Sequence, residues 1–360
     1  MTKFQLRRAW FQVHKWVGLS LAVLIIPLSL SGALLVWDQP FDRLINPSRY
    51  AVSGSATLPP HAYVDAARRV LPAGDRIASL AYPEGASPVI IEASVAGAPH
   101  HAGPPPRLSV WLDPPTARVL AVADSRSGAL RLIHRLHGSL MMPGVGRTIV
   151  GWIGVAMMLS CLTGLWLWWP TVGKWARGLR WRRHRNLDTN LHHLIGFWVA
   201  LPLFVLSLTG AWIALPGLFG GREQARPPAR FGGEPIAVPI TSPDAALTAA
   251  RRAGAAASAK ITWPTTGAAP SWTIVAGRQT ITLDDRDGAI AVAPTRRHGG
   301  TGLAGTMRRI HDGDGMGPLW QTIIFITGLL PAALAVTGIV MWWRARRWRA
   351  ALARRSPGRA

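Results

Sequence analysis

The stretch LIHRLHGSLMMPGVGRTIVGWIGVAMMLSCLTGLWLWWP, residues 132–170, decides the fold. It places histidines just before an uncharged run that ends in a tryptophan pair. The same layout returns later in the chain. Aligning His137 on His311, an offset of 174 residues, also superposes a Thr-Gly dipeptide and a tryptophan pair without a gap.

A second pair of segments repeats in the same way. Aligning His14 on His192, an offset of 178 residues, also superposes Gly32 on Gly210. The chain is therefore predicted to be a duplicated membrane hairpin, with one histidine at the start of every span.

Four uncharged runs of 21 to 25 residues support this organisation. About 20 helical residues cross a hydrocarbon core of roughly 30 Å, and 18 tryptophans are typical of aromatic belts at bilayer interfaces. The first run could be mistaken for a signal peptide, but its length and its kinship with the third run predict that it is retained. The four runs are Val17–Trp37, Thr148–Trp169, Leu194–Leu215 and Leu319–Trp343.

The net charge of +23 is distributed unevenly among the segments of the chain. This distribution indicates the topology in the membrane and argues against nucleic-acid binding. The chain start, the loop between the second and third runs, and the chain end are strongly basic. The long connections are more balanced, with eleven basic to eight acidic residues in 38–147 and twelve to eight in 216–318. Short basic segments stay in the cytoplasm. We therefore expect a multi-pass membrane protein with both termini cytoplasmic and both long connections outside.

The predicted fold class is an all-α membrane bundle of four transmembrane helices, a duplicated hairpin, with two small α+β modules in the periplasm. In chain order we expect an N-terminal lead and first span (1–37), a first periplasmic module (38–130), an interfacial helix and second span (131–170), a basic cytoplasmic loop (171–190), a third span (191–216), a second periplasmic module (217–310), a fourth span (311–343) and a basic cytoplasmic tail (344–360).

Each periplasmic module reads as one helix followed by strands and turns. In the first module we expect a helix over Pro59–Leu71, with strands over Ser87–Val95 and Arg107–Leu112. Residues 235–293 repeat this order. Residues 294–318 are expected to form a flexible lead into the fourth span.

Orientation sorts the four repeat-related histidines into two co-facial pairs. His14 and His192 start spans that run outward, so both lie at the cytoplasmic edge. His137 and His311 start spans that run inward, so both lie at the outer edge. Two histidines at each face suit the axial ligation of haem b iron within a four-helix bundle, and such residues near a membrane interior are functional candidates.

Two neighbouring histidines leave the ligand assignment open. His192 and His193 point about 100° apart on a helix, and the repeat favours His192. His134 and His137 share a helix face, and the repeat favours His137. We therefore take His14, His192, His137 and His311 as the iron ligands, with His134 and His193 as further haem contacts.

Simpler explanations exist for these residues. A single histidine at a helix end can simply reach the headgroups. Plain helix packing explains the small residues beside the spans as well as the placement of a flat ring against the backbone does. A zinc or iron site built directly from these side chains is disfavoured, because no H-E-x-x-H or C-x-x-C motif accompanies them. The single cysteine, Cys161, excludes a covalent c-type haem attachment.

The chain resembles the PepSY-associated transmembrane helix family, whose members include bacterial inner-membrane ferric-siderophore reductases. The strand ending in W-L-D-P-x-T-A resembles a PepSY module. The other matching motifs are HKWVGL (14–19), IHRLH (133–137), TGLWLWWP (163–170), NLHHLIGFW (190–198) and RIHDG (309–313).

This resemblance implies a location in the bacterial inner membrane, membrane-embedded haem and electron delivery to ferric chelates. Together with the two histidine pairs, it leads us to expect two haem b groups in a membrane oxidoreductase of the ferric-chelate reductase type. The acceptor would be a periplasmic ferric chelate or siderophore. No G-x-G-x-x-G precedes a helix and the chain ends soon after the last span, so we expect an external donor, either quinol or a separate reductase. If the chelate is anionic, the arginines beside the outer histidines would attract it: Arg131, Arg135, Arg308 and Arg309.

Two rival functions remain at this point. A haem-free PepSY membrane protein would bind or regulate a protease, or sense an envelope ligand. A subunit of a siderophore or metal transporter is disfavoured, because the spans lack the acidic residues expected for proton coupling. The tryptophans at the span ends are expected to anchor the bundle at the interfaces rather than to carry electrons: Trp37, Trp168, Trp169, Trp342 and Trp343.

Overall fold

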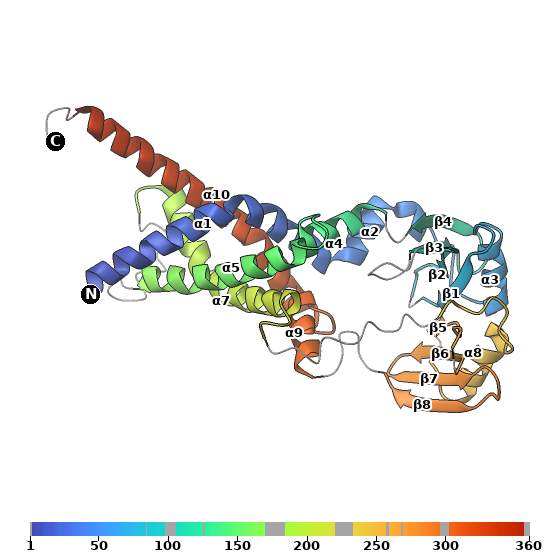
Figure 1. Cartoon of the computed structure of the whole chain (residues 1–360). Helices are drawn as coiled ribbons and strands as arrows, with labels where there is room; N and C mark the ends of the chain where they lie inside the picture. The colour runs from blue at the N-terminus through green and yellow to red at the C-terminus, as the bar shows by residue number, and fades with distance from the viewer. Residues whose placement is uncertain are drawn as a thin grey trace. The chain divides into compact units, whose positions relative to one another are not determined.

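The chain divides into two compact units in the computed structural model (Figure 1). One unit comprises Met1–Asp38, Leu132–Gln224 and Gly299–Ala360, and the other comprises Gln39–Arg131 and Ala225–His298. Most of the predicted basic cytoplasmic loop lies outside the described residues. The structure describes residues 2–83, 85–97, 106–124, 127–169, 184–219, 233–256, 259–267, 269–295 and 302–355.

Among its described residues, the first unit contains four helices that are long and apolar enough to cross a membrane, so the chain is a multi-pass membrane protein. Their most apolar windows have mean hydropathies between 1.8 and 2.4. The first helix starts at a capping box, in which Thr2 and Gln5 satisfy each other's backbone N–H groups. The four helices are α1 (Lys3–Val36), α5 (Gly146–Trp168), α7 (Leu187–Ala214) and α10 (Pro318–Arg355).

The four helices pack into a closed bundle. Helix α1 contacts α10 and α5, and helix α7 contacts the same two neighbours. Glycines permit the close approaches: a Cβ atom at Gly328 would lie 2.9 Å from the Cβ of Ala33, and one at Gly154 would lie 3.0 Å from the carbonyl oxygen of Ser207. Such contacts between small residues replace the hydrophobic effect as the source of helix association in lipid.

Two short amphipathic helices precede the second and fourth spans: α4 (Ala129–Ser139) before α5, and α9 (Leu303–Asp312) before α10. The expectation of a flexible lead over 294–318 is wrong where α9 forms. Gly313 ends α9 in the left-handed conformation (φ 78°), and the indole N–H of Trp320 donates to the carbonyl of Ile310 at 2.9 Å. The glycines around α9 conceal its helical periodicity in the sequence.

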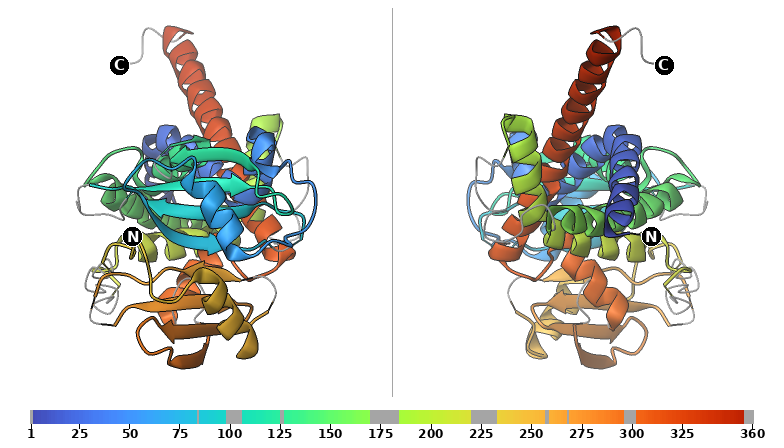
Figure 2. Two further views of the ribbon diagram at one scale, coloured as in Figure 1. Left: turned by 90° about the vertical axis from the view of Figure 1, so that its right-hand side faces the viewer. Right: turned by 90° about the vertical axis from the view of Figure 1, so that its left-hand side faces the viewer.

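The second unit contains one antiparallel sheet of eight strands in the order β4-β3-β2-β1-β5-β6-β7-β8. Helices α3 and α8 contact each other and lie on the same face of this sheet (Figure 2). The side chains between helices and sheet form the core, with Tyr63 and Trp272 fully buried. The elements of this unit are α2 (Asp38–Ile45), the 3-10 helix η1 (Pro47–Tyr50), α3 (Pro60–Arg68), β1 (Arg76–Ala81), β2 (Val89–Ser94), β3 (Arg107–Leu112), β4 (Val119–Asp124), α8 (Pro243–Arg252), β5 (Lys260–Thr262), β6 (Ser271–Ala276), β7 (Gln279–Asp284) and β8 (Ile290–Pro294).

Strands β1 and β5 join the two modules into one sheet. They pair antiparallel, with Leu80 opposite Ile261, and both side chains are fully buried. Neither strand is predictable from the sequence, because β5 has three residues and β1 is rich in Ala and Ser, which carry little strand signal.

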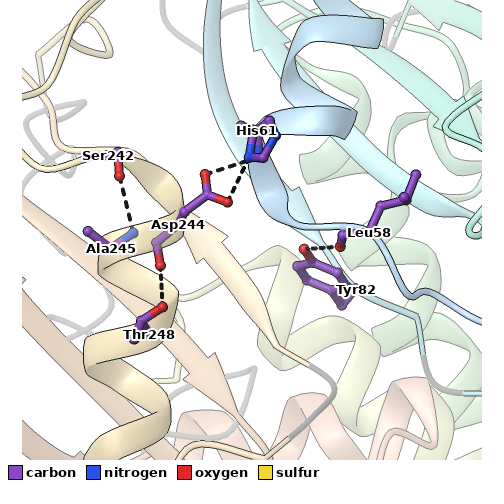
Figure 3. Close-up of polar contacts among 7 residues, drawn as sticks. All are labelled: Leu58, His61, Tyr82, Ser242, Asp244, Ala245 and Thr248. Atoms are coloured by element: carbon purple, nitrogen blue, oxygen red, sulfur yellow. Dashed lines mark hydrogen bonds and ion pairs between the residues drawn. The ribbon is translucent and has the colours of Figure 1, made fainter.

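The helices of the two modules also meet directly (Figure 3). The backbone N–H of His61, at the start of α3, donates to one carboxylate oxygen of Asp244 at 3.2 Å. Nδ1 of the His61 ring lies 2.9 Å from the other carboxylate oxygen of Asp244. Asp244 occupies the corresponding first turn of α8, where a carboxylate is favoured by the helix dipole.

A buried carboxylate anchors the turn after β3. Asp113 is 1% exposed and accepts hydrogen bonds from the backbone N–H and hydroxyl of Ser53 and from the hydroxyl of Thr116. Burial alone would raise the pKa of Asp113, but these hydrogen bonds outweigh it and hold the pKa below its ordinary value. Asp285 plays the same part in the second module, accepting from the backbone of Thr241 and the indole of Trp272.

Candidate functional site

The four repeat-related histidines lie in two pairs within the helical unit. The ring centroids of His14 and His192 are 6.4 Å apart, and the ring planes cross at 80°. Those of His137 and His311 are 6.1 Å apart, with the planes inclined at 33°. The first pair joins α1 to α7, and the second joins α4 to α9.

The two neighbouring histidines lie outside these pairs. The ring of His193 packs against that of His184 with centroids 4.8 Å apart, although His193 also lines the cavity described below. His134 is exposed on α4. The structure thus brings His192 to His14 and His137 to His311, as the repeat favours.

Thr-Gly dipeptides orient the rings of the first pair. Nδ1 of His14 lies 3.1 Å from the hydroxyl of Thr163, and Nδ1 of His192 lies 2.9 Å from that of Thr337. The ring edge also covers the following glycine: a Cβ atom at position 164 would lie 3.1 Å from Cε1 of His14.

The second pair is held in the same manner. Nδ1 of His311 lies 3.1 Å from both the hydroxyl of Thr209 and the carbonyl oxygen of Leu206. Nδ1 of His137 lies 2.9 Å from the carbonyl oxygen of Leu28 and 3.5 Å from the hydroxyl of Ser31. The glycines after these hydroxyls again lie under the rings: a Cβ atom at Gly210 would lie 2.9 Å from Cε1 of His311, and one at Gly32 would lie 2.6 Å from Cε1 of His137.

These contacts fix the tautomer of each imidazole. A carbonyl oxygen only accepts, so Nδ1 of His137 and His311 carries the proton. The hydroxyls of Thr163 and Thr337 already donate their single proton to carbonyls of their own helices at 2.8 and 2.9 Å. They must therefore accept from Nδ1 of the facing histidine. In all four rings the lone pair remains on Nε2.

Each pair consequently offers two neutral nitrogen donors to one metal ion. A metal–imidazole bond is roughly 2 Å, and two such bonds with the half-widths of two rings span about 6 Å, which matches both centroid separations. No group of three or more His, Cys, Asp or Glu side chains that could hold a metal gathers within the described ranges. Haem iron needs only two protein ligands beside its macrocycle, so a pair of imidazoles would suffice for it.

A cavity of about 1030 Å³ adjoins the first pair, large enough for a cofactor. All four spanning helices line it, and glycines contribute to its wall from α1, α5, α7 and α10. The cationic groups on its lining, Lys15, Arg185, Arg344 and Arg349, could hold carboxylates of a cofactor. Of these, Arg344 also bonds Asp188 at 2.5 Å and Thr189 at 3.0 Å.

The surroundings of the second pair favour neutral imidazoles. Burial lowers the pKa of His137 and of His311 to about 4, so both rings are uncharged at pH 7 and able to coordinate. Arg308 forms an ion pair with Asp312 at 3.8 Å. Arg309 lies on the same helix, and its side chain contacts Thr306.

The residues that sequence reasoning missed are the hydroxyls and one tryptophan. The Ser-Gly and Thr-Gly dipeptides are visible in the repeat, but their contact with the histidines depends on helix rotation, which periodicity does not give. Trp168 is only 4% exposed and stacks on Phe197 at 4.2 Å, so its prediction as an interfacial anchor is wrong. Trp169 and Trp343 are more than half exposed, as anchors require.

Comparison with known proteins identifies one family. The model of the PepSY-associated TM region matches residues 11–345, nearly the whole chain. A protein of Pseudomonas aeruginosa named Uncharacterized protein PA4219 is 39% identical over 93 residues. That match covers 25% of this chain and 23% of the relative's own length.

Proposed function

We propose that this chain, which belongs to the family of the PepSY-associated TM region, is a di-haem b electron-transfer protein of the bacterial inner membrane. His14 and His192 would hold one haem near the cytoplasmic face, and His137 and His311 would hold another near the periplasmic face. Electrons would pass from quinol or a separate reductase to a ferric chelate or siderophore in the periplasm.

One observation supports this proposal: two imidazole pairs have ring centroids 6.4 and 6.1 Å apart, and each Nδ1 faces a hydrogen-bond acceptor, which leaves the lone pair on Nε2. A lone histidine that reaches the headgroups needs no partner ring. Four that pair, each with its Nδ1 proton fixed, support bis-histidine ligation instead. A bound haem b would supply a one-electron ferric/ferrous couple at each pair.

The protein's own residues would bind each haem and shield its iron from water. The cations on the cavity wall would hold propionates, and the apolar spans would exclude water. The basic segments and the more balanced connections support an orientation with both termini in the cytoplasm. The duplicated hairpin would then account for one histidine pair near each face of the membrane.

The acceptor is expected to approach the outer pair. Arg308 and Arg309 lie on α9 within three residues of His311, so α9 brings positive charge close to that ring. An anionic ferric chelate would be attracted over about a Debye length, roughly 8 Å at physiological ionic strength. Reduction would transfer one electron and leave a ferrous chelate.

Anaerobic mixing of the dithionite-reduced, desalted protein with ferric citrate tests the proposal. We expect the reduced absorbance bands to decay as one ferrous ion, trapped by a ferrous-specific chelator, appears for each electron lost. A reduced spectrum that persists for minutes in excess ferric citrate and other ferric chelates would refute chelate reduction. A colourless protein would instead favour a haem-free role in binding or regulating a protease, or in sensing an envelope ligand.

A further inference from the structure

Four hydroxyl–glycine dipeptides lie against the four paired histidines, and the hydroxyls of three of them are within 3.1 Å of Nδ1. Each dipeptide comes from the same half of the chain as the histidine that it holds, whereas each histidine pair joins the two halves. The dipeptides are Ser31-Gly32 (with His137), Thr163-Gly164 (with His14), Thr209-Gly210 (with His311) and Thr337-Gly338 (with His192).

The hydroxyl oxygens are oriented acceptors. Thr163, Thr209 and Thr337 each donate to carbonyls three and four residues earlier, at 2.8 to 3.1 Å. Bonding to these carbonyls turns an oxygen lone pair toward Nδ1 of the histidine. Plain helix packing requires only a small residue at these positions, and a hydroxyl adds nothing to it.

We propose that Thr163 and Thr337 are positioning residues that set the orientation and the basicity of the imidazoles of His14 and His192. The inference rests on the proposed haem ligation. An acceptor on Nδ1–H gives the ring more imidazolate character, which strengthens Nε2 as a donor and stabilises ferric over ferrous iron. Each hydroxyl therefore lowers the reduction potential of the haem that its histidine holds.

Ser31 provides an internal control. Its oxygen is 3.5 Å from Nδ1 of His137, beyond the usual length of a hydrogen bond, while the carbonyl of Leu28 is at 2.9 Å. The main-chain carbonyl thus satisfies His137. Removing the Ser31 hydroxyl is expected to change little.

The test compares Thr163→Val and Thr337→Val with Thr163→Ser, Thr337→Ser and Ser31→Ala in the purified full-length protein. Valine keeps the shape and removes the acceptor, whereas serine keeps the acceptor. Spectroelectrochemical titration gives the midpoint potential of each haem, and resonance Raman spectroscopy reports the axial bonds. We expect valine at either position to shift the ferric/ferrous equilibrium of the inner haem toward ferrous by about tenfold, which is about 59 mV for one electron. The serine variants and Ser31→Ala should match the wild type.

Different failures would have different signatures. Valine variants that bind two haems with unchanged potentials would overturn the positioning role. Equal shifts or equal haem loss in the valine and serine variants would overturn it too, because shape rather than the hydroxyl would then matter. A wild-type protein without haem would instead refute the proposed function itself.

Discussion

At the scale of the residue, the site depends on glycines that admit an imidazole edge. Gly32 is the tightest of these positions, because an added Cβ atom would lie 2.6 Å from Cε1 of His137. Gly338 is the loosest, with 3.5 Å to Cε1 of His192. A Cβ atom is tolerated 3.5 Å from a ring atom but not 2.6 Å from it.

We therefore predict that Gly32→Ala displaces His137 and removes one haem, whereas Gly338→Ala retains both. Haem per chain, measured on the purified variants, checks this difference. If both variants kept two haems, the ring of His137 could not lie where the structure has it. Helical content by circular dichroism controls for misfolding, since alanine favours a helix over glycine.

A second prediction concerns acid sensitivity. The hydrogen bonds to Asp113 hold its folded-state pKa below the value of about 3.9 expected in the unfolded chain. Its stabilisation is thus fully present above that value and is lost as the pH falls through the folded-state pKa. We expect Asp113→Asn to lower the free energy of unfolding of the sheet unit by about 1–3 kcal/mol at pH 7.

Urea unfolding of wild type and Asp113→Asn at pH 7 and pH 3.5 measures this effect. The difference between the two proteins should shrink at the lower pH, as the wild-type carboxyl nears its own protonation. A difference that grew on acidification would show that Asp113 is not held ionised by its hydrogen bonds.

At this scale the sequence predicts which histidines pair, but it does not predict the residues that hydrogen-bond to them. The repeat alone favours His192 over His193, and the structure pairs His192 with His14. The hydroxyl contact of Thr163 is not predictable, because it depends on how α5 is rotated against α1. Two helices can cross with many rotations that bury equally apolar faces.

At the scale of the element, the apolar runs predict the four spans, since bilayer thickness imposes a length that the sequence displays. The strands at the centre of the sheet escape prediction. Strand β5 has three residues, and its place is fixed by pairing with β1 rather than by its own pattern. Tertiary context overrides the local signal there.

The junction between the modules gives a prediction at this scale. Ile261 is fully buried at the β1–β5 pairing, so Ile261→Ala should cost about 2–5 kcal/mol in unfolding free energy. Asp244 meets His61 at a largely exposed contact, where the histidine side chain is 61% exposed, and Asp244→Ala should cost less than about 1 kcal/mol.

Urea unfolding of the full-length protein, with the protease resistance of the sheet unit as the readout, ranks the two variants. Equal losses would mean that the strand pairing stabilises the sheet unit no more than the helix contact does. The reverse order would contradict the assignment of β1 and β5 as the central strands.

At the scale of the whole molecule, the distribution of charge predicts the orientation in the membrane. A green fluorescent protein fused after Ala360 should fluoresce, because the C-terminus is expected in the cytoplasm. Protease added to spheroplasts should cleave within residues 39–131 or 225–298 and leave that fluorescence intact. Cleavage that required lysis of the spheroplasts would reverse the proposed topology and with it the direction of electron transfer.

If the two imidazole pairs hold two haems, an absorbance spectrum of the detergent-purified protein will show them. Protein produced with ample haem should show sharp α and β bands on dithionite reduction, with two haems per chain, and one haem after His137→Ala or His14→Ala. A colourless protein, or one whose haem content is unchanged by both substitutions, would contradict the account.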